Sequence, residues 1–216
     1  MASRITAPKA PVISAPDLPE HLGDAEPAAR ADLTAARITL RDDTDLSHAT
    51  IEQCVLQGQA TRVDLRGATV FDVEASGIRI ADLQARGLNG RRIRIAGGRI
   101  GTLGLTDARL TEIDLRDARI DYLTLAGARV DHLRITGCTI ATLDMPQAIL
   151  ARVAFENTRA DEVDPRGMRS TDLDLRGLDA LNYLDVTALT GATLDSRQVQ
   201  LLAPALATAV GIRVVD

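Results

Sequence analysis

Apolar residues in this chain recur in a strict five-residue pattern. Between Asp117 and Ile135 they fall at 118, 120, 123, 125, 128, 130, 133 and 135, in alternating steps of two and three. A helix requires steps of three and four, and an extended strand requires steps of two. The same pattern holds from Val63 to Leu175. It predicts very short strands, each followed by a corner after five residues.

A chain with a corner every five residues must coil, and four such pentads make one four-sided turn. Residue n then lies beneath residue n+20, and backbone hydrogen bonds join successive coils that are about 4.8 Å apart. Parallel coiling of this kind is expected to be right-handed. Glycine suits the corners because a type II turn needs a positive φ. The glycines that end pentads are Gly67, Gly77, Gly87, Gly97, Gly127, Gly137, Gly167 and Gly177. We therefore predict an all-β protein, a right-handed quadrilateral parallel β-helix.

The pattern divides the chain into three segments. Residues 1–30 contain five of the eight prolines and are typical of a flexible or extended Pro/Ala-rich arm. The β-helix is expected over residues 31–194, with Leu33/Ala35 and Ile38/Leu40 as its first inward pairs. The frame shifts by one residue between Leu46 and Leu56, which predicts one extra residue near 41–45 and one fewer near 57–62. Residues 195–216 form a C-terminal segment of different character.

Three pentads carry a resemblance to a known family. VDLRG at 63–67, IDLRD at 113–117 and LDLRG at 173–177 resemble the A-(D/N)-L-x-x consensus of the pentapeptide-repeat proteins. The resemblance covers roughly residues 31–182 and implies the same right-handed quadrilateral β-helix. The first inward position departs from the consensus, because it often holds Leu, Ile or Val where Ala is typical. Leucine-rich repeats lack the five-residue step. Bactofilin-like polymerising β-helices stay an alternative.

The C-terminal segment predicts a helical cap. Asp195 or Ser196 can cap its first turn, with Gln198 placed for a capping box. Pro204 is expected to break or kink the helix, and Gly211 to end it. Four apolar residues fall on one side: Val199, Leu202, Leu206 and Val210. Similar C-terminal helices join two molecules in quinolone-resistance members of the pentapeptide-repeat family, the Qnr proteins. That resemblance implies a homodimer with these four residues as contacts, and simple capping of the last coil is the alternative.

Composition restricts the class of protein. Aromatic residues make up 2% of the chain against 45% hydrophobic residues, so the core must be filled by aliphatic side chains in thin layers. Cys54 and Cys138 occupy small inward positions without disulfide or metal spacing. No apolar run is long enough for a bilayer and no secretory signal is evident, so a cytoplasmic protein without membrane contact is expected. The net charge of −5 argues against direct binding of nucleic acid.

Residues that carry chemistry are sparse. His21, His48 and His132 are far apart, and no nucleophile–base pair can be formed from the sequence. The carboxylates of RDDTDLSH at 41–48 lack the glycine and terminal glutamate of a calcium loop, which favours a solvated bulge. We predict no catalytic, cofactor-binding or metal-binding residues, and no enzyme activity.

Charged residues form columns when the sequence is folded at a period of twenty. A nearly alternating column, Glu74, Arg94, Asp114, Arg134, Ala154 and Asp174, predicts an ion-pair ladder between coils. Arginines stack on two opposite walls. The first wall holds Arg79, Arg99, Arg119 and Arg159, and the second holds Arg109, Arg129 and Arg169. Two interpretations are open: a soluble surface that fixes the register, or a partner-binding surface.

Two functions are consistent with this sequence. The first is a non-enzymatic protein-interaction scaffold, dimeric through its C-terminal helix, whose partner is unknown. The second, implied by the family resemblance, is a modulator of DNA gyrase that gives quinolone protection by imitating the acidic surface of DNA. Residues 63–182 hold 18 acidic and 17 basic side chains, a net charge of −1, which is a poor match for DNA.

Overall fold

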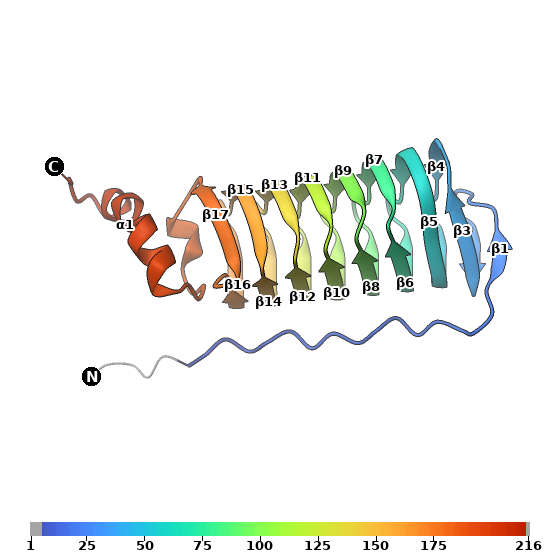
Figure 1. Ribbon diagram of the computed structural model, residues 1–216, viewed down its shortest axis with the longest axis horizontal. Helices are drawn as coiled ribbons and strands as arrows, with labels where there is room; N and C mark the ends of the chain where they lie inside the picture. The colour runs from blue at the N-terminus through green and yellow to red at the C-terminus, as the bar shows by residue number, and fades with distance from the viewer. Residues whose placement is uncertain (1–5, 215–216) are drawn as a thin grey trace.

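The protein is an elongated parallel β-helix with a helix at one end (Figure 1). The computed structural model describes residues 6–214, so the first five and last two residues of the predicted arm and cap lie outside the described part. The strands are β1 (Gly23–Ala25), β2 (Asp32–Thr34), β3 (Ala36–Leu40), β4 (Asp43–Asp45), β5 (Thr50–Asp64), β6 (Thr69–Ser76), β7 (Arg79–Gln84), β8 (Asn89–Ala96), β9 (Arg99–Gly104), β10 (Arg109–Arg116), β11 (Arg119–Thr124), β12 (Arg129–Thr136), β13 (Thr139–Asp144), β14 (Ile149–Glu156), β15 (Thr158–Asp164), β16 (Arg169–Asp174) and β17 (Leu178–Tyr183). They are followed by a 3₁₀ turn, Thr187–Leu189, and by α1, Ser196–Ala209.

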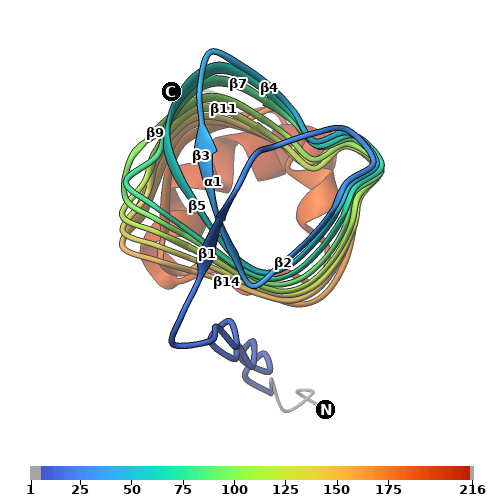
Figure 2. The same ribbon diagram turned by 90° about the vertical axis from the view of Figure 1, so that its right-hand side faces the viewer.

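The coils stack with the twenty-residue step that the sequence predicts. Strand β10 pairs in parallel with β8 and β12, which places Ile113 between Ile93 and Leu133. Each coil has four buried pairs, one on each side, and in the coil of β10 and β11 they are Ala108/Leu110, Ile113/Leu115, Ala118/Ile120 and Leu123/Leu125. The view along the axis shows the coils superimposed on one another (Figure 2), and the buried pairs lie inside them. The predicted fold class is therefore confirmed.

In each coil from Gly67 to Asn157, three of the four corners use a residue with positive φ. In the coil that contains β10 these residues are Asp107, Glu112 and Asp117, with φ of 56°, 58° and 51°. Glycine takes the equivalent of the first and third corners in the coil that follows, at Gly127 and Gly137. Because successive coils are in register, the left-handed residues form three columns along the rod.

The first coils differ from the prediction. Residues pair at a step of 18 from Arg37 to Val55, at a step of 19 from Thr50 to Thr69, and at a step of 20 from Gln59 to Arg79. The first coil is thus two residues short, and the predicted extra residue near 41–45 is wrong. Ala36 is buried in place of Ala35, which has φ of 53° at a corner. The sequence could not reveal this because alanine stands at both positions.

Residues 6–22 lie outside the β-helix and run extended along it, from its C-terminal end back to β1 (Figure 1). Strand β1 pairs with β3, so the arm joins the rod at its first coil. No described residue before Leu33 belongs to the buried core. The arm therefore lies on the surface of a rod whose interior is complete without it.

Helix α1 covers the last coil through a short set of contacts. Asp195 and Gln198 form the predicted capping box, in which each side chain accepts from the other residue's backbone N–H. The Gln198 amide also donates to the carbonyl oxygens of Leu175 and Leu178, at 2.7 and 2.8 Å. The Leu175 carbonyl also accepts from the Leu178 N–H. One side chain thus starts the helix and supplies a donor to the Leu178 carbonyl at the open end of the rod, where unpaired groups would invite association.

One expectation for this helix changes and one holds. The helix runs unbroken through Pro204 to Ala209, so the predicted break is wrong. Gly211 follows its end with φ of 81°, as expected of a C-terminal stop. The exposed position of Gln200 explains the tolerance of proline, since water can reach the carbonyl that Pro204 leaves without a donor. No helix among residues 6–214 is long and apolar enough to cross a membrane.

We predict that Gln198→Glu loosens the helix from the rod. Glutamate keeps the acceptor of the capping box but cannot donate to the carbonyls of Leu175 and Leu178, which should cost about 1–3 kcal/mol of docking free energy. Hydrogen exchange of the α1 amides should accelerate accordingly. Gln200→Glu, on the exposed surface of the same helix, is the matched control and should leave exchange unchanged. Equal exchange in both variants would contradict the proposed role of Gln198.

Candidate interaction surfaces

The arginine columns form in the predicted register. Arg99 lies between Arg79 and Arg119, and Thr139 separates Arg119 from Arg159. On the other sheet Arg109 pairs with Arg129, and Ile149 separates Arg129 from Arg169. Like charges about 5 Å apart repel, and carboxylates of the adjacent column offset them in the first wall. Asp121 lies 3.1 Å from Arg99 and 3.5 Å from Arg119, and the hydrogen bond from Arg99 lowers the pKa of Asp121.

A broad, open hollow lies beside the first arginine wall. Its floor includes Ala81 and Gly101, and Arg79, Arg99 and Arg119 are among the residues that line it. A Cβ atom on Gly101 would come within 2.4 Å of the Ala81 carbonyl oxygen, so this floor cannot carry a larger side chain without a backbone shift. The hollow therefore combines three stacked arginines with two small residues in adjacent coils.

The predicted ion-pair ladder forms from Glu74 to Arg134 and centres on Asp114. Its side chain is only 1% exposed, yet it contacts three guanidinium groups: Arg116 at 2.6 Å, Arg94 at 3.3 Å and Arg134 at 3.4 Å. Burial raises the pKa of Asp114, but the hydrogen bonds from Arg116 and Arg134 outweigh it, and the pKa lies below its ordinary value. Arg94 continues the ladder to Glu74 at 3.9 Å. Asp174 lies beyond Ala154 and pairs with Arg176 of its own coil instead.

The repeated Asp-Leu-Arg sequence has a local structural cause. The Asp64 carboxylate accepts from the backbone N–H of Arg66 at 3.0 Å and from its guanidinium, while the leucine between them points into the core. Asp174 and Arg176 repeat this arrangement, at 3.1 Å for the backbone bond. The hydrogen bond from Arg66 lowers the pKa of Asp64. These charges are used locally, at the corners, and are not free to act on a partner.

One column of left-handed corners differs from the other two. Along the other columns, from residue 67 onward, the positive-φ residues are Gly, Asp, Asn or Gln. The third column holds Asp72, Arg92, Glu112, His132, Arg152 and Asp172, with φ between 50° and 58° and no glycine. We refer to it as the 72–172 column. A non-glycine residue in this conformation costs roughly 1–3 kcal/mol, and arginine and glutamate lack the local hydrogen bonding that helps Asp and Asn. The 72–172 column therefore carries long or charged side chains although glycine would adopt this backbone conformation more easily.

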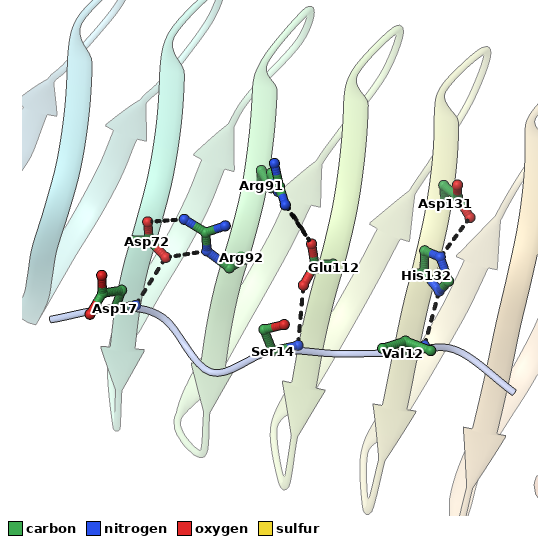
Figure 3. Close-up of polar contacts among 9 residues, drawn as sticks. All are labelled: Val12, Ser14, Asp17, Asp72, Arg91, Arg92, Glu112, Asp131 and His132. Atoms are coloured by element: carbon green, nitrogen blue, oxygen red, sulfur yellow. Dashed lines mark hydrogen bonds and ion pairs between the residues drawn. The ribbon is translucent and has the colours of Figure 1, made fainter.

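These side chains hold the N-terminal arm (Figure 3). Backbone N–H groups of the arm donate to four acceptors of the column: Asp17 to Asp72 at 2.9 Å, Ser14 to Glu112 at 3.2 Å, Val12 to His132 Nδ1 at 2.9 Å, and Lys9 to Asp172 at 3.0 Å. The two coils that the arm skips carry the arginines, Arg92 and Arg152, which pair instead with Asp72 and Asp131.

Neighbouring arginines pair with two of the carboxylates that accept hydrogen bonds from the arm, Asp72 and Glu112. Arg92 makes a bidentate contact with Asp72, and this hydrogen bond lowers the pKa of Asp72. Arg91 donates to Glu112 at 3.2 Å. Partial burial raises the pKa of Glu112, but the bonds from Ser14 and Arg91 outweigh it and leave the pKa lowered. Both carboxylates are thus held ionised and oriented towards the arm.

The arm matches the rod by its own repeat. Its half-buried residues between Thr6 and Glu20 are Pro8, Pro11, Ile13, Pro16, Leu18 and Pro19, and the first five follow one another in steps of 3, 2, 3 and 2. Each of the first four is followed by a residue that donates its N–H, so no proline falls at a donor position. Lys9 and Asp17 reach acceptors five coils apart, about 24 Å, which is about 3 Å per residue and close to the rise of a polyproline II helix.

The sequence analysis did not identify this contact, although signals for it exist. Ala-Pro recurs at a five-residue interval, in KAPVI at 9–13 and SAPDL at 14–18. The same interval separates equivalent donors, Lys9 from Ser14 and Val12 from Asp17. The second signal is the absence of glycine from one corner column.

The remaining chemical candidates are structural. Cys54 and Cys138 are buried, and desolvation raises the pKa of both thiols. His48, like His132, is a left-handed corner residue. No group of three or more His, Cys, Asp or Glu side chains within the described part of the chain is arranged to hold a metal ion.

The predicted dimer contacts do not share one environment. Leu202 and Leu206 are partly buried against the core, while Val199 and Val210 are 44% and 73% exposed. Leu201, which the sequence analysis did not select, is 67% exposed. The side of the helix that carries Leu202 and Leu206 thus faces the rod, and the exposed apolar residues lie on either side of it.

A four-sided aliphatic core, charged columns and a docked arm define an elongated parallel β-helix built from five-residue steps. No family model matches the chain, and neither does any curated protein. Among solved structures, the chain is similar to a trypsin-treated variant of QnrB1, a plasmid-mediated fluoroquinolone resistance protein, at 18% identity over 91% of this chain and 99% of that one, with a TM-score of 0.36. Full-length QnrB1 is 16% identical over 85% of this chain and 99% of that one, with a TM-score of 0.28. At these values the fold assignment rests on the register of the coils themselves.

We predict that Asp114→Asn lowers the free energy of unfolding at neutral pH by about 3–5 kcal/mol, because it leaves three arginines around a buried neutral amide. Asp121→Asn, in an exposed pair with Arg99, is the control and should cost about 0–1 kcal/mol. Denaturant unfolding measures both.

The difference between wild type and Asp114→Asn should depend on pH. Because the pKa of Asp114 is lowered in the folded state, its contribution is present above the unfolded pKa and is lost as pH falls through the folded value. The two unfolding curves should therefore converge in acid. A constant difference at every pH would show that the charge of Asp114 is not the cause.

Proposed function

We propose that this protein is a non-enzymatic protein-interaction scaffold that forms a homodimer through its C-terminal end. We also propose that the protein is located in the cytoplasm. The β-helix acts as a rigid spacer, and its faces and ends supply the contacts. Among the described residues, the aliphatic core holds an apolar cavity of about 60 Å³ lined by side chains such as Leu83, Ile93 and Leu103, which is too small to enclose a substrate and favours a binding function over catalysis.

The distribution of exposed apolar side chains carries this proposal. Nine large hydrophobic residues are exposed in the described part of the chain, and seven of them lie in its last 34 residues. These are Leu181, Leu184, Val199, Leu201, Val210, Ile212 and Val214. Apolar residues gathered at one end of a soluble rod are typical of an interface, since exposure to water is unfavourable for each of them. A second copy placed end to end would cover them.

The dimer contact in this proposal differs from the one expected from helical spacing. Leu202 and Leu206 hold the helix to its own rod, so a charge at either position would unpack the cap as well as a dimer. Val199, Leu201 and Val210 are available for a partner. A useful test must therefore change the flanks and leave the inward side intact.

We predict that Leu201→Arg/Val210→Arg converts a dimer into a monomer. Placing charge on exposed flanks of the helix should prevent apolar contact without disturbing the cap. Light scattering coupled to size exclusion gives the mass. Gln200→Arg/Thr208→Arg adds the same charge at exposed polar positions and should stay dimeric. A monomeric wild-type protein, or a double variant that keeps the dimer mass, would refute the proposal.

The arginine walls are the candidate surface for the unknown partner. Arg79, Arg99 and Arg119 line an open hollow, and Arg79 makes no ion pair within the described residues. An acidic protein surface would complement this wall. In the second wall, Arg109 and Arg129 are adjacent and Arg169 stands apart, and none of the three makes an ion pair among residues 6–214.

The alternative is a modulator of DNA gyrase that protects against quinolones. The family resemblance supports it, whereas the charge geometry does not favour DNA mimicry. Arginines alternate with carboxylates in the Glu74–Arg94–Asp114–Arg134 ladder, and Asp64 and Asp174 are neutralised by the arginines two residues later. Gyrase supercoiling with a fluoroquinolone tests this alternative. Protection by micromolar protein would favour it over a scaffold for another partner.

A further inference from the structure

We propose that the 72–172 column is a binding site for an extended, proline-containing segment of a partner protein, and that the N-terminal arm is a tethered competitor for this site. The inference rests on the proposed scaffold function and names the class of segment that one face would bind. The arm shows what the site accepts, because its backbone donates to acceptors in four of the six coils of the column. Figure 3 shows the contacts with Asp72, Glu112 and His132, and the fourth acceptor is Asp172.

The arm behaves as a ligand because the rod does not need it. No arm residue among those described is in the buried core, and its contacting side chains are only half buried. The four hydrogen bonds all run from arm backbone to rod side chains. Replacing the arm by another segment would therefore leave the core and the coil ladder unchanged.

The site recognises backbone geometry and spacing. Its acceptors bind N–H groups, so they require non-proline residues at the positions of Lys9, Val12, Ser14 and Asp17. The preceding positions hold Pro, Pro, Ile and Pro against the rod. A segment of the polyproline II type meets this pattern with little loss of conformational freedom, because its backbone is already extended and its N–H groups are free.

The acceptors are also built for this purpose. The column keeps charged and polar side chains at corners where glycine would be easier to accommodate. Arg92 and Arg91 orient Asp72 and Glu112 from within the rod, so the acceptors are positioned without the arm. A column that served only as a corner would not need these residues.

Tethering sets the strength of the competition. The arm is joined to the rod through β1, so it faces the site at a high effective concentration that a free segment must overcome. Weakening the arm without changing the rod should therefore reveal the site. Substituting proline at a donor removes the N–H and preserves the extended backbone.

The test uses the full-length protein and a fluorescent peptide of residues 6–20, TAPKAPVISAPDLPE, as the probe. Ser14→Pro/Asp17→Pro in the protein removes two arm donors, and the probe should then bind about tenfold more tightly than it binds wild type. Ala10→Pro/Ala15→Pro adds the same number of prolines at positions that donate no bond and should match wild type. A probe that carries proline at the positions of Val12 and Ser14 should bind weakly to every variant.

A second pair of substitutions tests the column itself. In the Ser14→Pro/Asp17→Pro background, Glu112→Gly/His132→Gly removes two acceptors and places glycine where φ is positive, so the melting temperature should not fall. Probe binding should be lost. Binding unchanged by these glycines, or equal binding to wild type and to the arm variant, would overturn the proposal.

Self-association distinguishes the occupant. If the arm of a second copy is the natural ligand, Ser14→Pro/Asp17→Pro should abolish a dimer that Leu201→Arg/Val210→Arg leaves intact, and the assignment to a partner protein would be overturned. Probe binding by a protein that is monomeric would instead support the site and refute dimerisation through the C-terminal end, so the two proposals fail separately.

Discussion

Backbone hydrogen bonds between successive coils are the interaction on which the rest of this molecule depends. From β6 onward they hold each paired residue beneath the residue twenty positions later, as in the pairing of Ile93, Ile113 and Leu133. Residues that are twenty positions apart therefore occupy equivalent positions in successive coils. Inward pairs become continuous aliphatic layers, and corners become columns of left-handed backbone. Charged side chains become columns whose neighbours are about 5 Å apart.

Because charged residues stack in columns, the β-helix is stable only if opposite charges lie close to each other. A column of like charges is unfavourable, so carboxylates must stand in the same or the adjacent column. Asp114 shows the extreme case, since it is buried and pairs with arginines of its own coil and of both neighbours. Asp121 offsets two stacked arginines from the next column. The near-neutral balance of the rod follows from these local requirements, and it leaves only particular surfaces, such as the hollow beside Arg79, with charge available to a partner.

At the ends and on the outer face of the rod, the chain makes contacts that the coil-to-coil repeat does not specify. At the C-terminal end Gln198 connects a helix to carbonyls that no further coil would satisfy. Along one face the arm uses the periodicity of the rod as a template, with donors spaced to meet side chains of separate coils. Function in such a protein is expected at these places, because the regular walls are occupied by the contacts that maintain the register.

The sequence by itself determined the β-helix, its period, its core, the ion-pair ladder and the capping box. Each depends on residues that are close in sequence or related by a fixed step, so periodicity alone identifies them. The length of the first coils was decided only in the tertiary structure, because Ala35 and Ala36 are equally able to face inward. The same holds for the side of α1 that faces the rod, where Gln198, Leu202 and Leu206 act together. The docking of the arm joins Lys9 to Asp172 and Asp17 to Asp72 across an interval that no local pattern encodes. Its repeat is visible in the sequence, but only the stacked coils bring its acceptors into one line.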